Sequence, residues 1–321
     1  MTQKIEISHR TIIFTVFLLL GLWVLFEIRD IIILIFISFI LMAALRPSVD
    51  RLGKMKIPRL LAVLIVYLFL FLVLGVATSF ILPPFVSQSV KLSSRLPSYI
   101  NFVLPFLKID LQTITSQIAP IGENLLKVIV GFFSNVFATL TVIVFTFYFL
   151  LERKKLEENL GQLIGEKAAE KTVAILREVE ESLGAWVRGQ FLLAGLIGAM
   201  TFVGLTLLGI DYALPLSIIA GALEIVPILG PIISGIPAVL VALTTSPFLA
   251  LATVALYFII HQSEGNIVVP LVMNKIMGLP PIATILALMI GGRLGGIVGA
   301  ILAVPLLMVL KTILLAFLKN K

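Results

Sequence analysis

The chain has 321 residues, of which 60% are hydrophobic and only 13% are Asp, Glu, Lys or Arg. Soluble domains are about half apolar and roughly a quarter charged, so this composition excludes an ordinary soluble globular domain and predicts an integral membrane protein. The net charge of +7 is typical of basic loops flanking membrane spans and does not indicate nucleic-acid binding. Cysteine is absent, which excludes disulfides, Cys-ligated metals and thiol nucleophiles.

Hydropathy predicts an all-α chain with about eight membrane-spanning segments, because about 20 consecutive apolar residues cross a bilayer as a helix. The predicted segments are residues 11–28, 31–45, 60–82, 128–151, 191–209, 213–244, 248–262 and 281–318. The first lacks a small-residue cleavage site after it, so we interpret it as an uncleaved span rather than a signal peptide. The segments 213–244 and 281–318 are too long for one straight helix. We expect Pro/Gly-broken or re-entrant elements there, the second over residues 281–305.

Basic residues near the ends of the predicted spans indicate the orientation of the chain. Loop 46–59 contains five Arg or Lys residues and one Asp, and further basic groups lie at 153–155 and at the C-terminus. Positive charges stay on the cytoplasmic side, so we expect the N- and C-termini in the cytoplasm of a cell with the chain in its inner membrane. Residues 83–127 are then extracytoplasmic. Their apolar spacing predicts short amphipathic helices, either a lid or oligomer contact or a simple connection.

Residues 152–188 form the one soluble-looking block of the sequence. Apolar residues recur there at spacings of three and four, which predicts a cytoplasmic amphipathic helical segment with a solvated charged face. We therefore divide the chain into an N-terminal transmembrane scaffold (1–151), this segment (152–188) and a C-terminal transport half (189–321). Most glycines and prolines fall in the last part. Irregular backbone is tolerated at membrane depth only where protein covers it or water reaches it, so we expect the site there.

The stretch LEIVPILGP, residues 223–231, places an acid among helix breakers. A carboxylate inside a span costs several kcal/mol by insertion scales (about +2.5 to +3.5 for Asp), which makes Glu224 a functional candidate. Pro227 and Pro231 should free nearby carbonyl groups, that of Leu223 among them, and Gly230 should permit a sharp turn. These groups would suit a cation or a hydrogen-bonding solute. Alternatively, Glu224 caps the break or pairs with a basic residue.

The stretch HQSEGN provides a second polar group, with His261 and Glu264 on one helix face and Gln262 and Asn266 nearby. The spacing is two ligands short of a zinc site, so we predict neither a metal nor a cofactor. Solute coordination or gating is one interpretation of these residues. A polar helix end is the other.

The stretch GGRLGGIVGAILAVP spaces Gly291, Gly295 and Gly299 by four residues, which predicts a small-residue face for close helix packing. Arg293 could meet an anionic solute or Glu224, or extend toward an interface. The sequence contains no G-x-S-x-G, Walker A or HExxH motif. We therefore expect no enzyme, and we expect any transport to be driven by gradients or to run downhill.

Several strings in the C-terminal half occur in a specific combination: Y-A-x-x-L, I-x-P-x-x-G-P, E-G-N-x-x-x-P and G-G-x-x-G-G-x-x-G. Together they resemble the autoinducer-2 exporter (AI-2E) family of permeases, most densely over residues 184–310. The resemblance implies a transporter without an ATPase, export of the quorum-sensing signal autoinducer-2 and, for some members, sodium or lithium/proton antiport. It also implies homo-oligomers, pentamers among them. The family pattern often has Asn where this chain has Glu224, a departure that favours cation or proton coupling.

Three functional hypotheses follow for a chain whose partners are the lipid bilayer and a small solute. The leading one is a secondary exporter of a small polar solute, in which the C-terminal half moves against the N-terminal spans and the site lies between 213–244 and 281–305. The second is a monovalent cation/proton antiporter that uses Glu224 and Glu264. The third is a non-transport membrane scaffold that docks partners on residues 152–188.

Overall fold

The structure, a computed structural model, describes residues 9–107, 136–226, 229–273 and 280–318. These residues form α-helices, one π-helix and connecting turns, with no strand among them. Within the described part, six helices are long and apolar enough to cross a membrane, and shorter apolar helices accompany them. The predicted all-α membrane fold is thereby confirmed.

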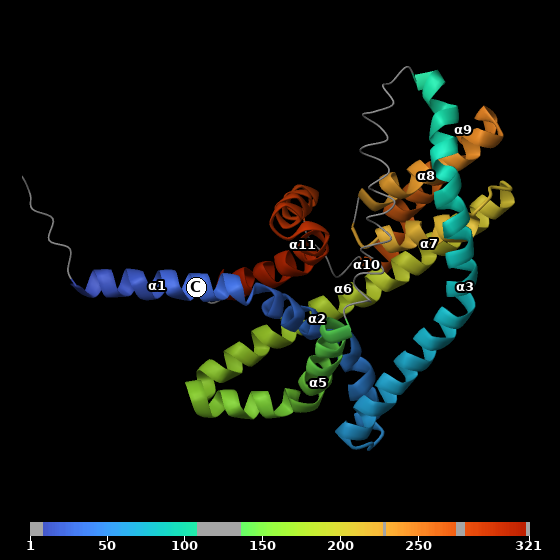
Figure 1. The fold of residues 1–321 in the computed structure, drawn as a ribbon. Helices are drawn as coiled ribbons and strands as arrows, with labels where there is room; N and C mark the ends of the chain where they lie inside the picture. Colours follow the sequence, from blue (N-terminus) through green and yellow to red (C-terminus); the bar gives the residue numbers. More distant parts are fainter. Residues whose placement is uncertain (1–8, 108–135, 227–228, 274–279, 319–321) are drawn as a thin grey trace, which may run out of the picture.

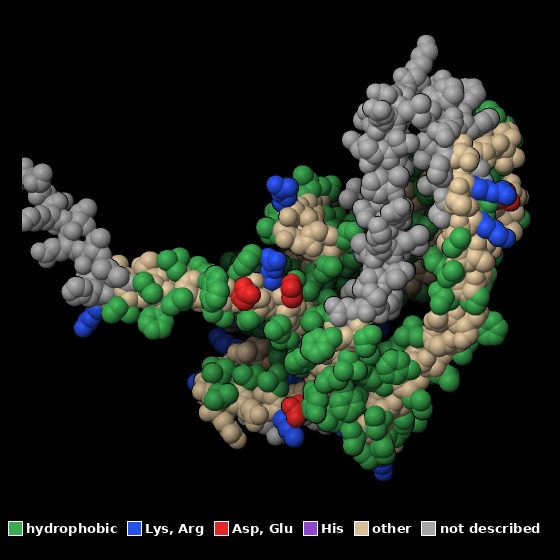
Figure 2. All heavy atoms as spheres, in the orientation of Figure 1, with side chains coloured by type: hydrophobic (Ala, Val, Ile, Leu, Met, Phe, Trp, Pro, Cys, Tyr) green, Lys and Arg blue, Asp and Glu red, His purple; other side chains and the backbone are tan. Residues whose placement is uncertain are grey.

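The N-terminal part contains α1 (His9–Glu27), α2 (Arg29–Lys54), α3 (Arg59–Leu107) and α5 (Val136–Ile164). Helix α1 extends away from the other helices (Figure 1) and exposes large apolar side chains along its length. Figure 2 shows apolar side chains along α1 and α3, with charged side chains in a few small groups. A helix that is apolar all round and exposed fits a lipid environment rather than water.

Helix α3 differs from the sequence prediction. We expected a span to end near residue 82 and short separate helices to follow, but α3 continues through Pro83 and Pro84 to Leu107 as one curved helix (Figure 1). A proline removes one helical hydrogen bond and bends the helix, which does not end it when the helical pattern resumes on the far side. Residues 108–135, which include the rest of this region and the start of the predicted 128–151 span, lie outside the described residues.

The block 152–188 is helical, but it does not form a separate unit. Helix α5 continues past Arg153 to Ile164, and α6 (Glu166–Leu207) continues into the predicted 191–209 span. Gly165 separates the two helices with a positive φ of 81°, which a residue with a Cβ rarely adopts. The two helices form a hairpin next to α2 (Figure 1).

The predicted broken element 213–244 is two helices, α7 (Ala213–Leu223) and α8 (Leu229–Thr245), which pack against each other. Helix α7 also packs along α6, where a Cβ on Gly221 would lie 2.6 Å from the carbonyl oxygen of Ala194. Helix α9 (Pro247–Ser263) follows, and its N-cap Ser246 accepts a 3.1 Å hydrogen bond from the backbone N–H of Leu249. A π-helix (Glu264–Val268) and α10 (Val269–Met273) complete this stretch.

The last element, α11 (Pro281–Leu318), is broken at Gly295 and Gly296 and folds back on itself. Gly296 has a φ of 58°, a conformation that glycine adopts without strain. Gly291 and Gly299 lie on the two arms, and a Cβ on either would overlap the carbonyl oxygen of the other. The three glycines therefore do not share one continuous face: Gly291 and Gly299 face each other, and Gly295 forms the turn. A regular repeat of four predicts close packing but does not reveal that the helix reverses.

Three apolar clusters form the interior. One joins α6 to α2 and α11 and includes Leu183, Trp186 and Val304. A second lies among α6, α7, α8 and α9 around Leu205 and Leu216. The third joins α2, α3 and α5 around Met42 and Leu150. Helix α6 contributes to two of the three clusters and so connects the N-terminal helices to the C-terminal ones.

Candidate functional site

Glu224 lies immediately after the last residue of α7 and is one of the most deeply buried residues, with 2% of its surface exposed. Its backbone N–H still bonds to the carbonyl oxygen of Ala220 at 3.2 Å, so α7 fixes its position. Its Oε2 atom accepts no hydrogen bond from the described residues. Since a buried carboxylate is costly unless its oxygens are satisfied, this position calls for a proton, a cation or a solute donor.

The turn after Glu224 corrects one sequence expectation. The carbonyl of Leu223 is not free: it accepts a 3.0 Å hydrogen bond from the N–H of Val226, because the chain closes a tight turn as soon as α7 ends. Gly230 packs so closely on this carbonyl that a Cβ there would overlap it. Gly230 is thus needed for the approach of α8 to α7. Pro227 lies outside the described residues, and Pro231 lies in the first turn of α8, where a proline is tolerated.

The second predicted group lies at the end of α9, where α-helix changes to π-helix at Glu264. Nδ1 of His261 lies 3.2 Å from Oε2 of Glu264, as their shared helix face predicts. The His261 side chain is 45% exposed, whereas that of Glu264 is 10% exposed. The π-helix widens the turn that carries Glu264, and such segments are frequent at functional sites.

The structure brings Glu224 and Glu264 together from different helices. The carboxyl of Glu264 faces that of Glu224 closely enough for a side-chain hydrogen bond between them. Two carboxyl groups can form such a bond only when one of them carries a proton, because a deprotonated carboxylate has no hydrogen to donate. Two buried carboxylates would also repel each other. We refer to these two side chains as the carboxyl pair; His261 extends it toward the surface. The pair can hold a proton and exchange it for a cation or for a solute donor.

Gln190, which no sequence pattern singles out, borders the same site. It is 4% exposed on α6, and its Nε2 donates a 2.5 Å hydrogen bond to the backbone carbonyl of Glu224. Its Oε1, like Oε2 of Glu224, accepts no hydrogen bond from the described residues. The sequence signal for this residue is a single glutamine just before the apolar stretch 191–209. A glutamine there is equally typical of the polar edge of a membrane span.

Other predicted site residues lie elsewhere. Gln262, Asn266 and Arg293 are exposed. Arg293 lies shortly before the glycine break of α11, and the charged group that lies against Glu224 is Glu264. Instead of α11, the π-helix after α9 faces Glu224. Helix α11 packs along α6, and Val226, in the turn beyond Glu224, packs against the apolar cluster that α11 shares with α2 and α6.

An open pocket of about 440 Å³ lies between α8 and α9. Its walls are mainly apolar, with Tyr257 and His261 among the lining residues. Because His261 also contacts Glu264, one lining residue of the pocket touches the carboxyl pair. The described residues contain no group of three or more His, Cys, Asp and Glu side chains that could hold a metal ion.

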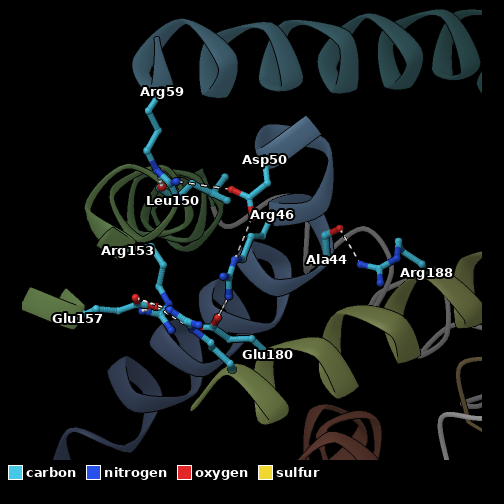
Figure 3. A network of polar contacts seen from close by, with 10 residues as sticks. Ala44, Arg46, Asp50, Arg59, Leu150, Arg153, Glu157, Glu180 and Arg188 are labelled. Atoms are coloured by element: carbon cyan, nitrogen blue, oxygen red, sulfur yellow. Dashed lines mark hydrogen bonds and ion pairs between the residues drawn. The ribbon is translucent and has the colours of Figure 1, made fainter. Parts of the chain in front are cut away.

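A second polar group lies away from the carboxyl pair, among α2, α3, α5 and α6 (Figure 3). Glu180 of α6 is buried, accepts a 2.5 Å hydrogen bond from Nε of Arg153 and pairs with Nη1 of Arg46. Asp50 pairs in turn with Arg46 and Arg59. The prediction that the charges of 152–188 are solvated is therefore wrong for Glu180 and Arg153. Glu180 lies one residue after Val179 on the apolar stripe, which was a usable signal for its burial.

The outer edge of this group is solvated. Arg177 donates hydrogen bonds to both carboxylate oxygens of Glu157, at 3.1 and 2.6 Å, and its side chain is 52% exposed. The pKa of the Glu157 carboxyl is lowered from its ordinary value, chiefly by the hydrogen bond from Arg177. The charges of Arg153, Arg177 and Arg46 lower it further, and burial opposes them.

Comparison with known proteins identifies the family of the chain. The family model described as "AI-2E family transporter" matches residues 12–319. The chain is 29% identical to the provisionally named transport protein YrrI of Bacillus subtilis, over 90% of this chain and 86% of that protein. It is 26% identical to the AI-2 transport protein TqsA of Escherichia coli (88% and 85% covered) and 26% identical to a sodium-lithium/proton antiporter of Halobacillus andaensis (80% of each). The chain belongs to the AI-2E transporter family, as a multi-pass membrane protein.

Proposed function

We propose that this transporter is a proton-coupled secondary exporter of a small polar solute and that the carboxyl pair, Glu224 and Glu264, is its proton-linked site. The observation that carries the proposal is that two acids meet in the interior of a chain with very few charges in its C-terminal half. Such a pair releases its shared proton when a competing ligand arrives, which couples solute movement to proton movement. TqsA, named for AI-2 transport, supports an autoinducer-2-like solute.

Helix lengths support an arrangement around this site. Helix α7 has 11 residues and the first arm of α11 ends near Gly295. At 1.5 Å per residue these arms are about 16 and 21 Å long, which is less than the roughly 30 Å hydrocarbon core. We assign both as re-entrant arms that place their turns within the membrane. The basic loops support cytoplasmic termini in an inner membrane, and the family resemblance supports a homo-oligomer.

A second function, sodium or lithium/proton antiport, is favoured by one specific observation. Oε2 of Glu224 and Oε1 of Gln190 are buried acceptor atoms without a donor among the described residues. Hard cations prefer oxygen ligands, so these atoms and the carboxyl pair suit a small monovalent cation. The relative named as a sodium-lithium/proton antiporter is compatible with this alternative.

Flux in proteoliposomes tests both functions in one design. Purified protein is assayed for autoinducer-2 movement under an imposed pH gradient and for Na⁺- or Li⁺-driven proton movement with an internal pH dye. We expect Glu224→Gln and Glu264→Gln to abolish coupling in whichever of the two assays shows activity of the wild type. The control is Asp211→Asn, which removes an exposed acid from the turn between α6 and α7 and should leave flux unchanged.

The outcomes separate the alternatives. Autoinducer-2 movement without cation exchange supports the exporter, and the converse supports the antiporter. Full coupling in both glutamine variants would overturn the role of the carboxyl pair. The scaffold hypothesis gains support only if no solute moves and removal of residues 152–188 abolishes recruitment of a partner protein.

A further inference from the structure

The carboxylate of Glu180 joins three helices. Oε1 accepts a 2.5 Å hydrogen bond from Nε of Arg153 on α5, and Oε2 pairs with Nη1 of Arg46 on α2 (Figure 3). The side chains of Glu180 and Arg153 are 1% and 4% exposed. We call these three side chains the Glu180 cluster.

Because the Glu180 cluster is buried, the relative positions of its side chains are tightly constrained. Removing one partner of a buried ion pair leaves an uncompensated charge in the interior, whereas an exposed pair can separate into water at little cost. The same stretch of α6 touches α2 twice more. A Cβ on Gly184 would overlap the carbonyl oxygen of Ala43, and Nη1 of Arg188 donates a 3.1 Å hydrogen bond to the carbonyl of Ala44. The cluster therefore fixes both the depth and the rotation of α6 against α2 and α5.

Helix α6 leads from this cluster to the carboxyl pair. It continues without interruption from Glu180 to Gln190, a rise of about 15 Å at 1.5 Å per residue. Gln190 then donates its 2.5 Å hydrogen bond to the carbonyl of Glu224. Because a helix is stiff over this distance, a shift of α6 at Glu180 moves Gln190 and, through it, the residue that bears the transport carboxyl.

We propose that Glu180 is a positioning residue for transport: by holding α6 between Arg46 and Arg153, it sets, through Gln190, the placement of Glu224 opposite Glu264. This inference rests on the proposed function for the role of the carboxyl pair, but the placement itself is measurable without transport. The N-terminal helices then contribute to transport, since α2 and α5 hold α6, the helix that positions the carboxyl pair.

Carbodiimide labelling measures the placement directly. N,N′-dicyclohexylcarbodiimide reacts with protonated carboxyls in apolar surroundings, and peptide mass mapping quantifies the modification of Glu224 as a function of pH. We expect Glu180→Gln to shift the midpoint of Glu224 labelling by about one pH unit or to change its rate several-fold. The matched control, Glu178→Gln, removes an exposed carboxylate from the same helix α6 and should leave both quantities unchanged.

Two further variants separate position from charge and from folding. Arg46→Lys keeps the charge but removes the planar guanidinium, so it should alter Glu224 labelling in the same direction even if Glu180→Gln does not fold. In a Gln190→Leu background, Glu180→Gln should produce no additional change in Glu224 labelling, because the hydrogen bond from residue 190 to the carbonyl of Glu224 is already lost.

The remaining results distinguish failure of the positioning from failure of the proposed function. Wild-type labelling in folded Glu180→Gln or Arg46→Lys protein would overturn the proposal. An equal shift in Glu178→Gln would overturn it as well. Additive effects of the Glu180 and Gln190 substitutions would refute the path through Gln190. If labelling shifts as expected but no variant or wild type transports either solute, the positioning stands and the proposed function fails.

Discussion

Gly291 and Gly299 pack backbone against backbone across the two arms of α11. Each lies where a Cβ would overlap the other's carbonyl oxygen, and a Cβ on Gly291 would also lie 2.9 Å from the Cβ of Ala303. The sequence of this segment is typical of one long apolar helix. In the structure it forms a hairpin, held by this contact, that reverses at Gly295 and Gly296. Small residues permit such approach in membranes, where van der Waals packing and hydrogen bonds replace the hydrophobic effect between helices.

We expect Gly299→Ala to destabilise the hairpin, because overpacking of a close contact costs about 1–3 kcal/mol. The thermal midpoint of the purified protein in detergent should fall measurably. Gly292→Ala is the control, since its Cβ would meet Ala300 at an ordinary 3.9 Å and alanine favours helix over glycine. Equal midpoints for the two variants would contradict the packing of the two arms.

Gly230→Ala should disturb the turn that carries Glu224, because the added methyl overlaps the carbonyl of Leu223. We expect lower coupled flux in proteoliposomes together with a lower thermal midpoint. Gly195→Ala on the neighbouring helix α6 has nothing within 4 Å of its new Cβ and should behave as wild type. Normal flux in Gly230→Ala would show that the turn has room for a side chain.

Gln190→Leu should lower coupled flux by about tenfold or more, because a buried carbonyl left without its donor costs about 1–3 kcal/mol. The substitution keeps a similar volume, so folding should be retained, as size-exclusion chromatography can verify. Gln162→Leu on α5, an exposed position, serves as the control for the change in residue type. Unchanged flux in Gln190→Leu would exclude the amide from the site.

The contact between Glu157 and Arg177 should contribute to stability in a pH-dependent manner. The pKa of Glu157 is lowered in the folded protein, so its contribution is present above the unfolded value of about 4.3 and is lost as the pH falls through the folded pKa. The thermal midpoint of wild type minus that of Glu157→Gln should therefore be positive near neutrality and approach zero in acid. A difference that does not vary with pH would contradict the assignment.

The sequence predicted the membrane class, most of the helical segments and the two broken elements, since these depend on local properties. Hydropathy reports whether a segment suits lipid, and clustered Pro and Gly report where a helix is interrupted. The pairing of His261 with Glu264 was also predictable, because residues three apart on a helix are neighbours. Glu224 stood out for the same local reason: an acid in an apolar run is rare.

The tertiary structure alone decided which distant residues meet. That Glu224 faces Glu264 rather than Arg293 depends on how α7 and α9 pack on α6 and α8, and no spacing within either segment encodes it. The same holds for Glu180, whose burial requires arginines from α2 and α5, and for Gln190, which matters because α6 runs along α7. Periodicity fixes the face of a helix, but the partner of that face is set by the joint packing of all helices, which no single segment determines.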